Sequence, residues 1–272
     1  MPPYDNRGLD RTKSYMLASG MEDETTVQKE ITEKLVTALK QGGFVLYAQK
    51  IVPLKAGDDR PFREILVRFR EEEDKLLPPG TFFPMLEEYH LLPYVDRWVV
   101  SSLAKWAQGA RPGHPAGCNS VNLSGDTLRD AKFGEYVQKH IEMSKLPAGT
   151  LAFECGWDMV LPRADQLKRL QTHLKPLGCR FTLAGFDGSE ASFGFLKSIA
   201  PDFVKLGYSV VKDVERGLAG LERAESISQK CHALGIKTIA EYVESREVLE
   251  HLKLIEVDFA QGLAISPPQH LE

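Results

Sequence analysis

The stretch FVLYAQKIVPLKAGDDRPFREILVRF, residues 44–69, decides the fold. It contains two runs rich in β-branched, aromatic and other apolar residues, Phe44–Ile51 and Arg63–Phe69. The link between them, Val52–Phe62, carries two prolines and a glycine and has no room for a crossover helix. Parallel neighbouring strands need a crossover of about a dozen residues or more. The two runs are therefore predicted to pair as antiparallel strands.

Beyond this pair, short β-rich runs alternate with helix-length stretches. Apolar spacing predicts a helix over Val27–Gln41, and two more helices fit around Pro79–Leu92 and Pro93–Ala110. The six further runs are Cys118–Ser124, Thr150–Cys155, Cys179–Phe186, Asp202–Leu206, Ile236–Glu241 and Val257–Gly262. About eight strands in this alternation favour a closed α/β barrel over an open sheet.

Length and charge agree with one such domain. The chain has 272 residues, 43% of them hydrophobic, and a formal net charge of -4. A single α/β barrel typically needs about 250 residues. The composition excludes a disordered or collagen-like chain. A mildly acidic balance argues against DNA as a partner but leaves room for one small anionic ligand held by local cations.

The termini and the cysteines indicate an ordinary cytoplasmic protein. Residues 1–26 are polar and are interpreted as a tail or linker, so the barrel domain is placed at residues 27–272. No apolar run reaches the ~18 residues of a membrane span. The thiols Cys118, Cys155, Cys179 and Cys231 form no CxxC pair and are predicted to be buried and reduced. A cytoplasmic location is expected. The chain could also be the C-terminal part of a larger cytoplasmic protein.

Polar residues at the ends of apolar strands are the candidates for function, because barrel interiors are mostly apolar. Singly, each has a structural interpretation as an ion-paired edge residue, a surface lysine or a turn residue. Together they would converge on one mouth of the barrel, where carboxylates, amides and a lysine suit two-metal phosphodiester chemistry. These residues are Glu64, Arg68, Asn122, Glu154, Lys205, Glu241, Glu244 and Gln261.

From about Phe44 to Pro268 the chain resembles the EAL domain of bacterial cyclic di-GMP signalling. Glu64-Ile65-Leu66 stands where that family has Glu-Ala-Leu, and Arg68 follows as in the family. Further matching positions are Gln49, Phe83, Glu87, Asp96-Arg97-Trp98, Val121-Asn122-Leu123-Ser124, Phe153-Glu154, Ala240-Glu241-Tyr242-Val243-Glu244, Gln261-Gly262 and Pro267-Pro268. Each box is weak by itself, but their order along nearly the whole chain is specific.

The resemblance implies an α/β fold, a modified (β/α)8 TIM-type barrel with one antiparallel strand, and a cyclic di-GMP pocket at its mouth. It also implies a possible homodimer and a protein partner or attached signalling domains. The implied ligand-binding residues are Gln49, Glu64, Leu66, Arg68, Asp96, Asn122, Glu241, Glu244, Gln261 and Pro267. The remnant of the family's catalytic set is Glu64, Asn122, Glu154, Lys205 and Glu241, of which Glu64, Asn122 and Glu154 are the remnant metal ligands.

One departure from the family pattern bears on catalysis. The family's fifth strand ends in Asp-Asp-Phe-Gly, and its two aspartates ligate the catalytic metals. Here Ala184 and Gly185 stand at those positions. Asp187 falls one residue past Phe186, on the opposite face by strand parity, so only a bulge would bring it back. Two further departures are Gly156-Trp157 for Thr-Glu and Gly207 for the aspartate of Lys-Ile-Asp.

These departures separate catalysis from binding. Mg²⁺ and Mn²⁺ are held mainly by carboxylates, so losing two of them should abolish metal-dependent hydrolysis. Phosphate recognition by Arg68 needs neither aspartate. The leading hypothesis is a catalytically degenerate EAL domain that is not an enzyme and binds cyclic di-GMP without a cofactor. The alternatives are an active or weak phosphodiesterase that uses Mg²⁺ or Mn²⁺ with Asp187 or Glu190 as substitute ligands, and an interaction scaffold without nucleotide.

Overall fold

The computed structural model describes residues 33, 36–55, 60–70, 76–77, 79–109 and 117–271. The predicted tail 1–26 lies outside this part of the chain. Of the predicted helix Val27–Gln41, residues 33 and 36–41 are described and are helical.

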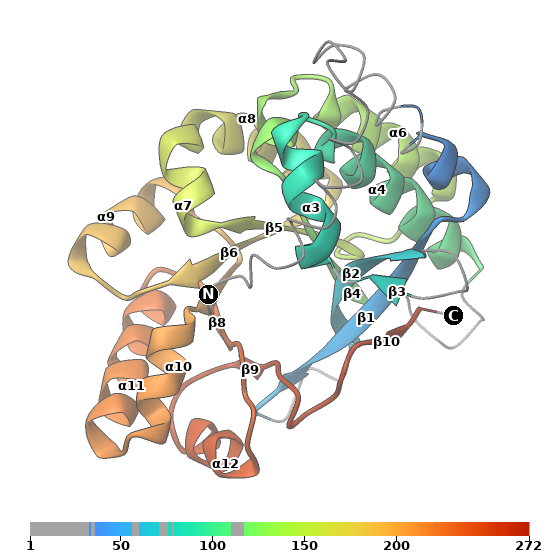
Figure 1. Cartoon of the computed structure of the whole chain (residues 1–272). Coiled ribbons are helices and arrows are strands. Elements are labelled where there is room, and N and C mark those ends of the chain that lie inside the picture. Colours follow the sequence, from blue (N-terminus) through green and yellow to red (C-terminus); the bar gives the residue numbers. More distant parts are fainter. Residues whose placement is uncertain are drawn as a thin grey trace, which may run out of the picture.

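Eight strands form a closed ring, as Figure 1 shows. Strand β1 pairs antiparallel with β2 and β9, and every other neighbouring pair in the ring is parallel. The ring consists of β1 (Phe44–Pro53), β2 (Phe62–Arg70), β4 (Cys118–Asn122), β5 (Leu151–Gly156), β6 (Arg180–Phe186), β7 (Phe203–Leu206), β8 (Lys237–Ala240) and β9 (Phe259–Ala260). This confirms the predicted α/β barrel of TIM type with one reversed strand.

The β1–β2 pair follows from the short link that the sequence places between them. Its register runs from Phe44 opposite Phe69 to Ile51 opposite Phe62. Two short strands outside the ring were not predicted, because two residues give no alternation to detect. They are β3 (Leu76–Leu77), which pairs with β2, and β10 (Gln269–His270), which pairs with β1.

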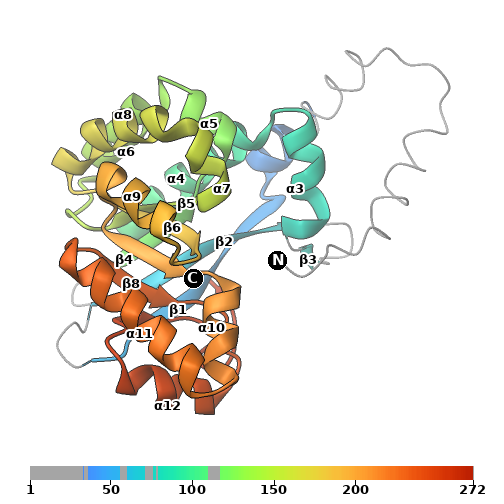
Figure 2. The ribbon, with the colours of Figure 1, turned by 90° about the vertical axis from the view of Figure 1, so that its left-hand side faces the viewer.

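Helices cover the outside of the ring (Figures 1 and 2). They are α3 (Pro79–Glu88), α4 (Leu92–Gln108), α5 (Gly125–Arg129), α6 (Phe133–Ser144), α7 (Trp157–Val160), α8 (Ala164–Leu174), α9 (Glu190–Ile199), α10 (Tyr208–Glu215), α11 (Leu218–Ala233) and α12 (Arg246–Leu254), with short 3-10 turns at Leu161–Arg163 and Lys175–Leu177. Three of them begin at a serine whose hydroxyl accepts a backbone N–H, namely Ser124, Ser189 and Ser245. Each of these serines follows a parallel strand, so the caps fix the chain beside the carboxyl ends of the strands.

The core has two parts. The larger lies between strands and helices and includes the fully buried rings of Phe153, Phe181 and Phe186. A smaller cluster fills the barrel at the opposite end from those serine caps, with Phe62, Phe203 and Phe259 in mutual ring contact. The carboxyl end of the barrel interior is left for polar side chains. All four cysteines are buried and free, as predicted.

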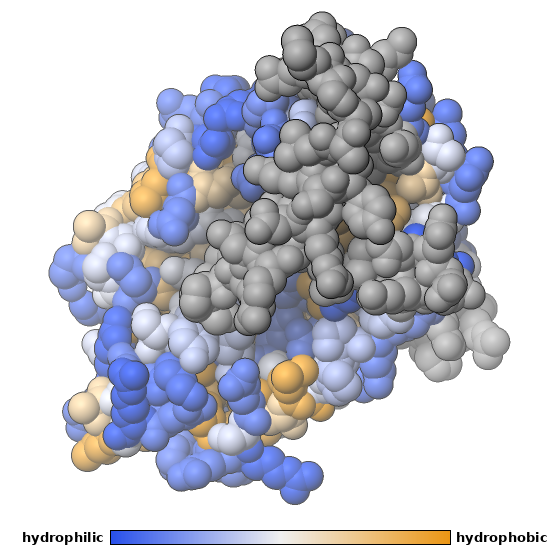
Figure 3. Space-filling view, in the orientation of Figure 1, coloured by the Kyte–Doolittle hydropathy of each residue, from blue (hydrophilic) through white to orange (hydrophobic). Residues whose placement is uncertain are grey.

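The visible part of the surface is mainly hydrophilic around α10, α11 and α12, with apolar residues in small patches (Figure 3). Within the described ranges, every helix is too short or too polar to traverse a lipid bilayer.

Candidate functional site

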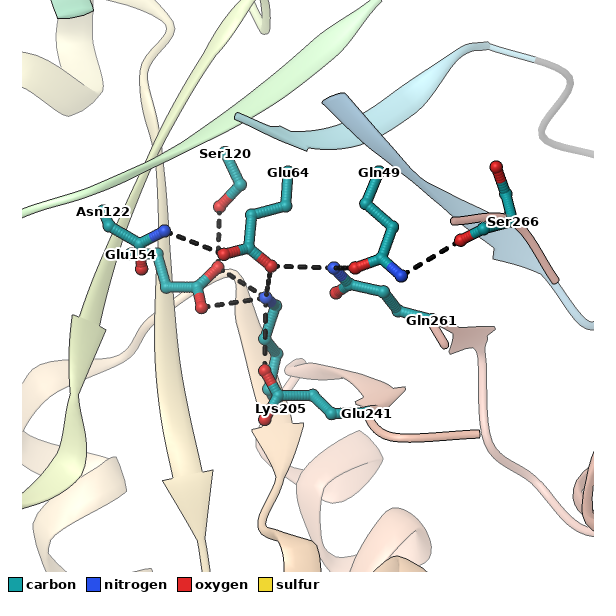
Figure 4. Close-up of polar contacts among 9 residues, drawn as sticks. All are labelled: Gln49, Glu64, Ser120, Asn122, Glu154, Lys205, Glu241, Gln261 and Ser266. Atoms are coloured by element: carbon teal, nitrogen blue, oxygen red, sulfur yellow. Dashed lines mark hydrogen bonds and ion pairs between the residues drawn. The ribbon is translucent and has the colours of Figure 1, made fainter. Parts of the chain in front are cut away.

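Lys205 lies at the centre of the polar end of the barrel. It is the third residue of β7, its side chain is 0% exposed, and it points at three glutamates from three other segments (Figure 4). Its Nζ lies 2.8 Å from Glu64 Oε2, 2.8 Å from both oxygens of Glu154 and 3.2 Å from Glu241 Oε1. A buried ammonium is stable only with such partners.

Glu64 is the second hub of this network. Asn122 Nδ2 donates to its Oε1 at 2.8 Å, and Gln261 Nε2 donates to its Oε2 at 2.7 Å. Gln261 also donates to Gln49 Oε1 at 3.0 Å, and Gln49 donates in turn to the Ser266 carbonyl. The network thus joins β2, β4, β1 and the segment after β9. It brings together six of the eight polar strand-end residues that the sequence indicated, and Arg68 and Glu244 are not part of it.

The protonation of the cluster follows from this geometry. Burial and the Glu64 carboxylate raise the pKa of Glu154 to about 8. Burial also raises the pKa of Glu241. For Glu64, burial opposes ionisation, but Lys205 and the two amide donors outweigh it and lower the pKa. The pKa of Lys205 is raised well above its usual value because its three glutamates outweigh the effect of burial. At neutral pH the cluster is therefore centred on a Lys205–Glu64 ion pair, with Glu154 largely protonated.

A cavity of about 910 Å³ opens above this network. Seven residues predicted to bind ligand line it: Gln49, Glu64, Leu66, Asn122, Glu241, Glu244 and Gln261. The cavity is large enough for a nucleotide, whereas pockets for drug-sized ligands begin near 300 Å³. Glu154 also lines the cavity, and Lys205 lies beneath it.

Three residues predicted to bind ligand do not line this cavity. Arg68 lies further along the same face of β2, where its guanidinium stacks 5.4 Å from the Tyr47 ring centre and donates to the Val67 carbonyl. Asp96 is buried on α4, where its carboxylate accepts from Ser124 and Thr127 at the start of α5. Pro268 lines the cavity in place of Pro267. The ligand contacts of Arg68, Asp96 and Pro267 therefore stay predictions.

The carboxyl end of β6 presents no carboxylate to the cavity. Ala184 and Gly185 line it, and the register with β7 shifts between Leu183 and Phe186, which is a β-bulge. Gly185 has a φ of +81°. A Cβ at Gly207 would lie 3.2 Å from the Gly185 carbonyl, so the two glycines belong to one tight backbone contact.

Asp187 follows the bulge and reaches the rim of the cavity. Its Oδ1 is already bonded to the Ser189 N–H at 2.9 Å and the Ser192 hydroxyl at 2.7 Å. Glu190 is paired with Lys230 on the outside of the barrel. The two residues that the sequence offered as substitute metal ligands therefore have other partners: Asp187 bonds to the first turn of α9, and Glu190 pairs with Lys230 on α11.

Three of the glutamates that line the cavity or border it contact Lys205. Across the described residues, no three carboxylate, imidazole or thiol groups are arranged to share a metal ion. The glutamates that could contribute surround the Lys205 ammonium instead. Mg²⁺ requires near-octahedral oxygen ligands, usually including carboxylates that are free to bind it.

Sequence reasoning missed an aromatic pair at the rim. Tyr208 and Tyr242 line the cavity, their ring centres are 5.6 Å apart, and their exposed fractions are 43% and 49%. Tyr242 has a φ of +56°, which L-residues adopt rarely. The only sequence signal was the aromatic residue inside Ala240-Glu241-Tyr242-Val243-Glu244. Ser120, which donates to Glu154 at 3.0 Å, had no signal because it is a small residue within a buried strand.

Comparisons with known proteins place this site in a family. The model of the EAL domain matches residues 32–268, so the chain belongs to the EAL domain family of cyclic di-GMP signalling. The chain is 29% identical over 238 residues to cyclic di-GMP phosphodiesterase PdeB of Shewanella oneidensis, covering 88% of this chain and 28% of that protein. It is 30% identical over 254 residues to cyclic di-GMP phosphodiesterase PdeF of Escherichia coli, covering 90% of this chain and 33% of that protein. The chain thus spans about a third of the length of these relatives.

Solved structures show the same fold. The FimX EAL domain from Pseudomonas aeruginosa bound to cyclic di-GMP superposes with a TM-score of 0.80 at 25% identity, covering 88% of this chain and 95% of that chain. The Xanthomonas citri FimX EAL domain in complex with cyclic di-GMP gives a TM-score of 0.83 at 20% identity, covering 92% and 97%.

Proposed function

We propose that this chain is a receptor domain that binds cyclic di-GMP at the mouth of the barrel and does not hydrolyse it. One observation carries the proposal. The end of β6 offers Ala184 and Gly185 to the cavity, while Glu64, Glu154 and Glu241 contact Lys205. The polar groups that could bind the ligand are thus present, whereas the two carboxylates of the family pattern at the end of β6 are absent.

Several features of the cavity suit a cyclic dinucleotide. Amides and carboxylates on its wall match the donors and acceptors of guanine, and Tyr208 and Tyr242 offer ring faces to a base. Arg68 lies beyond Leu66 on the same strand face, within reach of a phosphate that extends past the rim. The solved FimX EAL domain, similar in fold and at 25% identity, carries cyclic di-GMP.

The receptor function predicts binding without metal. Calorimetric titration of cyclic di-GMP in EDTA should give the same affinity as titration in excess Mg²⁺, because no step of binding uses the cation. Mg²⁺-dependent binding would instead favour the phosphodiesterase alternative. If millimolar cyclic di-GMP gave no heat of binding and no shift in melting temperature, the interaction scaffold without nucleotide would be the alternative that remains.

Arg68→Ala tests the predicted phosphate contact. Loss of one charge-assisted contact should weaken binding by roughly 10- to 150-fold, from about 1.5–3 kcal/mol. The matched control is Arg169→Ala on α8, an arginine that does not line the cavity. Equal affinities of the two variants would remove Arg68 from the binding site and leave the cavity itself to be tested.

A further inference from the structure

A second cavity, of about 420 Å³, lies at the other end of the barrel. It is lined by the first residues of six strands of the ring: Phe62 of β2, Cys118 of β4, Arg180 of β6, Phe203 of β7, Lys237 of β8 and Phe259 of β9. The amino ends of the parallel strands therefore form its wall. It shares no residue with the cavity at the mouth.

The floor of this cavity is aromatic and its wall is basic. The rings of Phe62, Phe203 and Phe259 pack at centre distances of 5.1, 5.6 and 6.0 Å and are nearly buried. Arg180 lies over the Phe203 ring at 5.8 Å, and Lys237 lies over the Phe259 ring at 5.5 Å. The rings hold the two cations by cation–π contact.

These cations outnumber the acidic groups around them. Among the described residues that line the cavity, Arg180 and Lys237 are cations and Asp202 is the one carboxylate. Asp202 Oδ2 accepts the Phe181 N–H at 2.8 Å and lies 3.7 Å from Lys175 Nζ. In the parts of the chain that the structure describes, neither Arg180 nor Lys237 forms an ion pair with a carboxylate.

We propose that this cavity binds a small phosphate-bearing anion between Arg180 and Lys237. A concave site lined by one sign of charge concentrates counter-ions. The Arg180 guanidinium offers a planar fork of donors that matches phosphate oxygens, and the Lys237 ammonium adds a point charge. Because the rings of the floor lie beneath the cations, recognition depends on the charge of the ligand and not on stacking of a base.

The proposal is tested by calorimetric titration of inorganic pyrophosphate at constant ionic strength. The wild-type chain should bind it saturably, and Arg180→Gln with Lys237→Gln should weaken binding by about tenfold or more. The matched control Lys139→Gln, an exposed lysine on α6, should bind as the wild type does. If Arg180→Gln lowers the circular dichroism signal of the folded state, the single variant Lys237→Gln, at an exposed position, is used instead. Its affinity for pyrophosphate should be about threefold or more below that of the wild type.

Further arms locate the ligand and identify its source. Arg169→Ala on α8 should leave pyrophosphate binding unchanged, because Arg169 lines neither cavity. Guanosine monophosphate that binds as well as pyrophosphate would point to a nucleotide as the source, and weaker binding to a compact phosphate. The proposal would be overturned if pyrophosphate showed no saturable binding up to ~10 mM, which corresponds to a binding free energy weaker than about -3 kcal/mol. Equal affinity of all variants would also overturn it, because that would indicate non-specific screening.

Discussion

Lys205 shows how one residue organises the polar end of the barrel. Its ammonium contacts three glutamates while its own side chain is shielded from solvent. Such a group stabilises the fold only as long as its partners remain, because an unpaired buried charge is costly. The same contact that satisfies Lys205 also occupies the carboxylates that a metal would need. The contacts that stabilise the fold at Lys205 therefore also affect which carboxylates are available to a metal.

Lys205→Ala should destabilise the chain by about 3–5 kcal/mol, since it leaves buried glutamates without their cation. Urea denaturation monitored by circular dichroism measures this loss. Lys139→Ala on the surface of α6 is the control and should change stability by less than about 0.5 kcal/mol. Adding Glu64→Gln to Lys205→Ala should recover part of the stability. A Lys205→Ala chain as stable as the control would contradict the described network.

Glu154 should make stability depend on pH. Its pKa is raised in the folded chain to about 8, from an ordinary value of 4.5, so the folded state holds the proton more tightly than the unfolded state. This contribution is fully present below pH ~4.5 and is lost as pH rises through about 8. Urea melts at pH 5 and pH 8.5 should show the loss.

Glu154→Gln should reduce this fall in stability between the two pH values. Part of the fall should remain because Asp96, whose pKa burial raises to about 6, acts with the same sign. Glu222→Gln on α11, an exposed position, serves as the control and should keep the wild-type pH profile. An unchanged profile in Glu154→Gln would mean that Glu154 titrates normally.

At the scale of elements, the proposed loss of catalysis rests on β6. The bulge at Ala184 and Gly185 includes the left-handed backbone of Gly185, and a Cβ at Gly207 would lie within 3.2 Å of the Gly185 carbonyl. The departures at 185 and 207, separate in the sequence, are therefore neighbours in the structure. The carboxylate of Asp187, just after β6, caps the turn that begins α9.

Restoring carboxylates at β6 should create a cation site. Ala184→Asp with Gly185→Asp should fold, at a cost of roughly 1–2 kcal/mol for a side chain at a positive φ. Its melting temperature should rise saturably with Mn²⁺, whereas the wild type should show no such rise. The uncharged pair Ala184→Asn with Gly185→Asn separates charge from shape. A wild-type response equal to that of the aspartate variant would show that a metal site already exists.

Much of the ring of strands could be predicted from the sequence. The short link after Phe44–Ile51 forces an antiparallel pair, and the polar residues at strand ends converge because parallel strands end at one rim. The positions of Arg68 and Asp96 could not be predicted. They depend on how far β2 extends past the rim and on which face of α4 meets α5, and the sequence pattern contains neither. The left-handed backbone of Tyr242 likewise leaves no trace in composition.

At the scale of the whole molecule, the barrel has two chemically different ends. The mouth carries amides, glutamates and exposed tyrosines around a buried lysine, and the opposite end carries cations over an aromatic floor. Fixed strands separate the two, so ligands at either end can be tested independently. The Lys237→Gln chain should therefore bind cyclic di-GMP as the wild type does.

The central claim is that the mouth binds cyclic di-GMP without cleaving it. The most direct measurement is a titration of cyclic di-GMP in excess Mg²⁺ or Mn²⁺, followed by chromatography of the nucleotide recovered from the same sample. The account predicts saturable heat and fully intact cyclic di-GMP. Linear dinucleotide formed at a steady rate, and lost in Glu64→Ala, would contradict it.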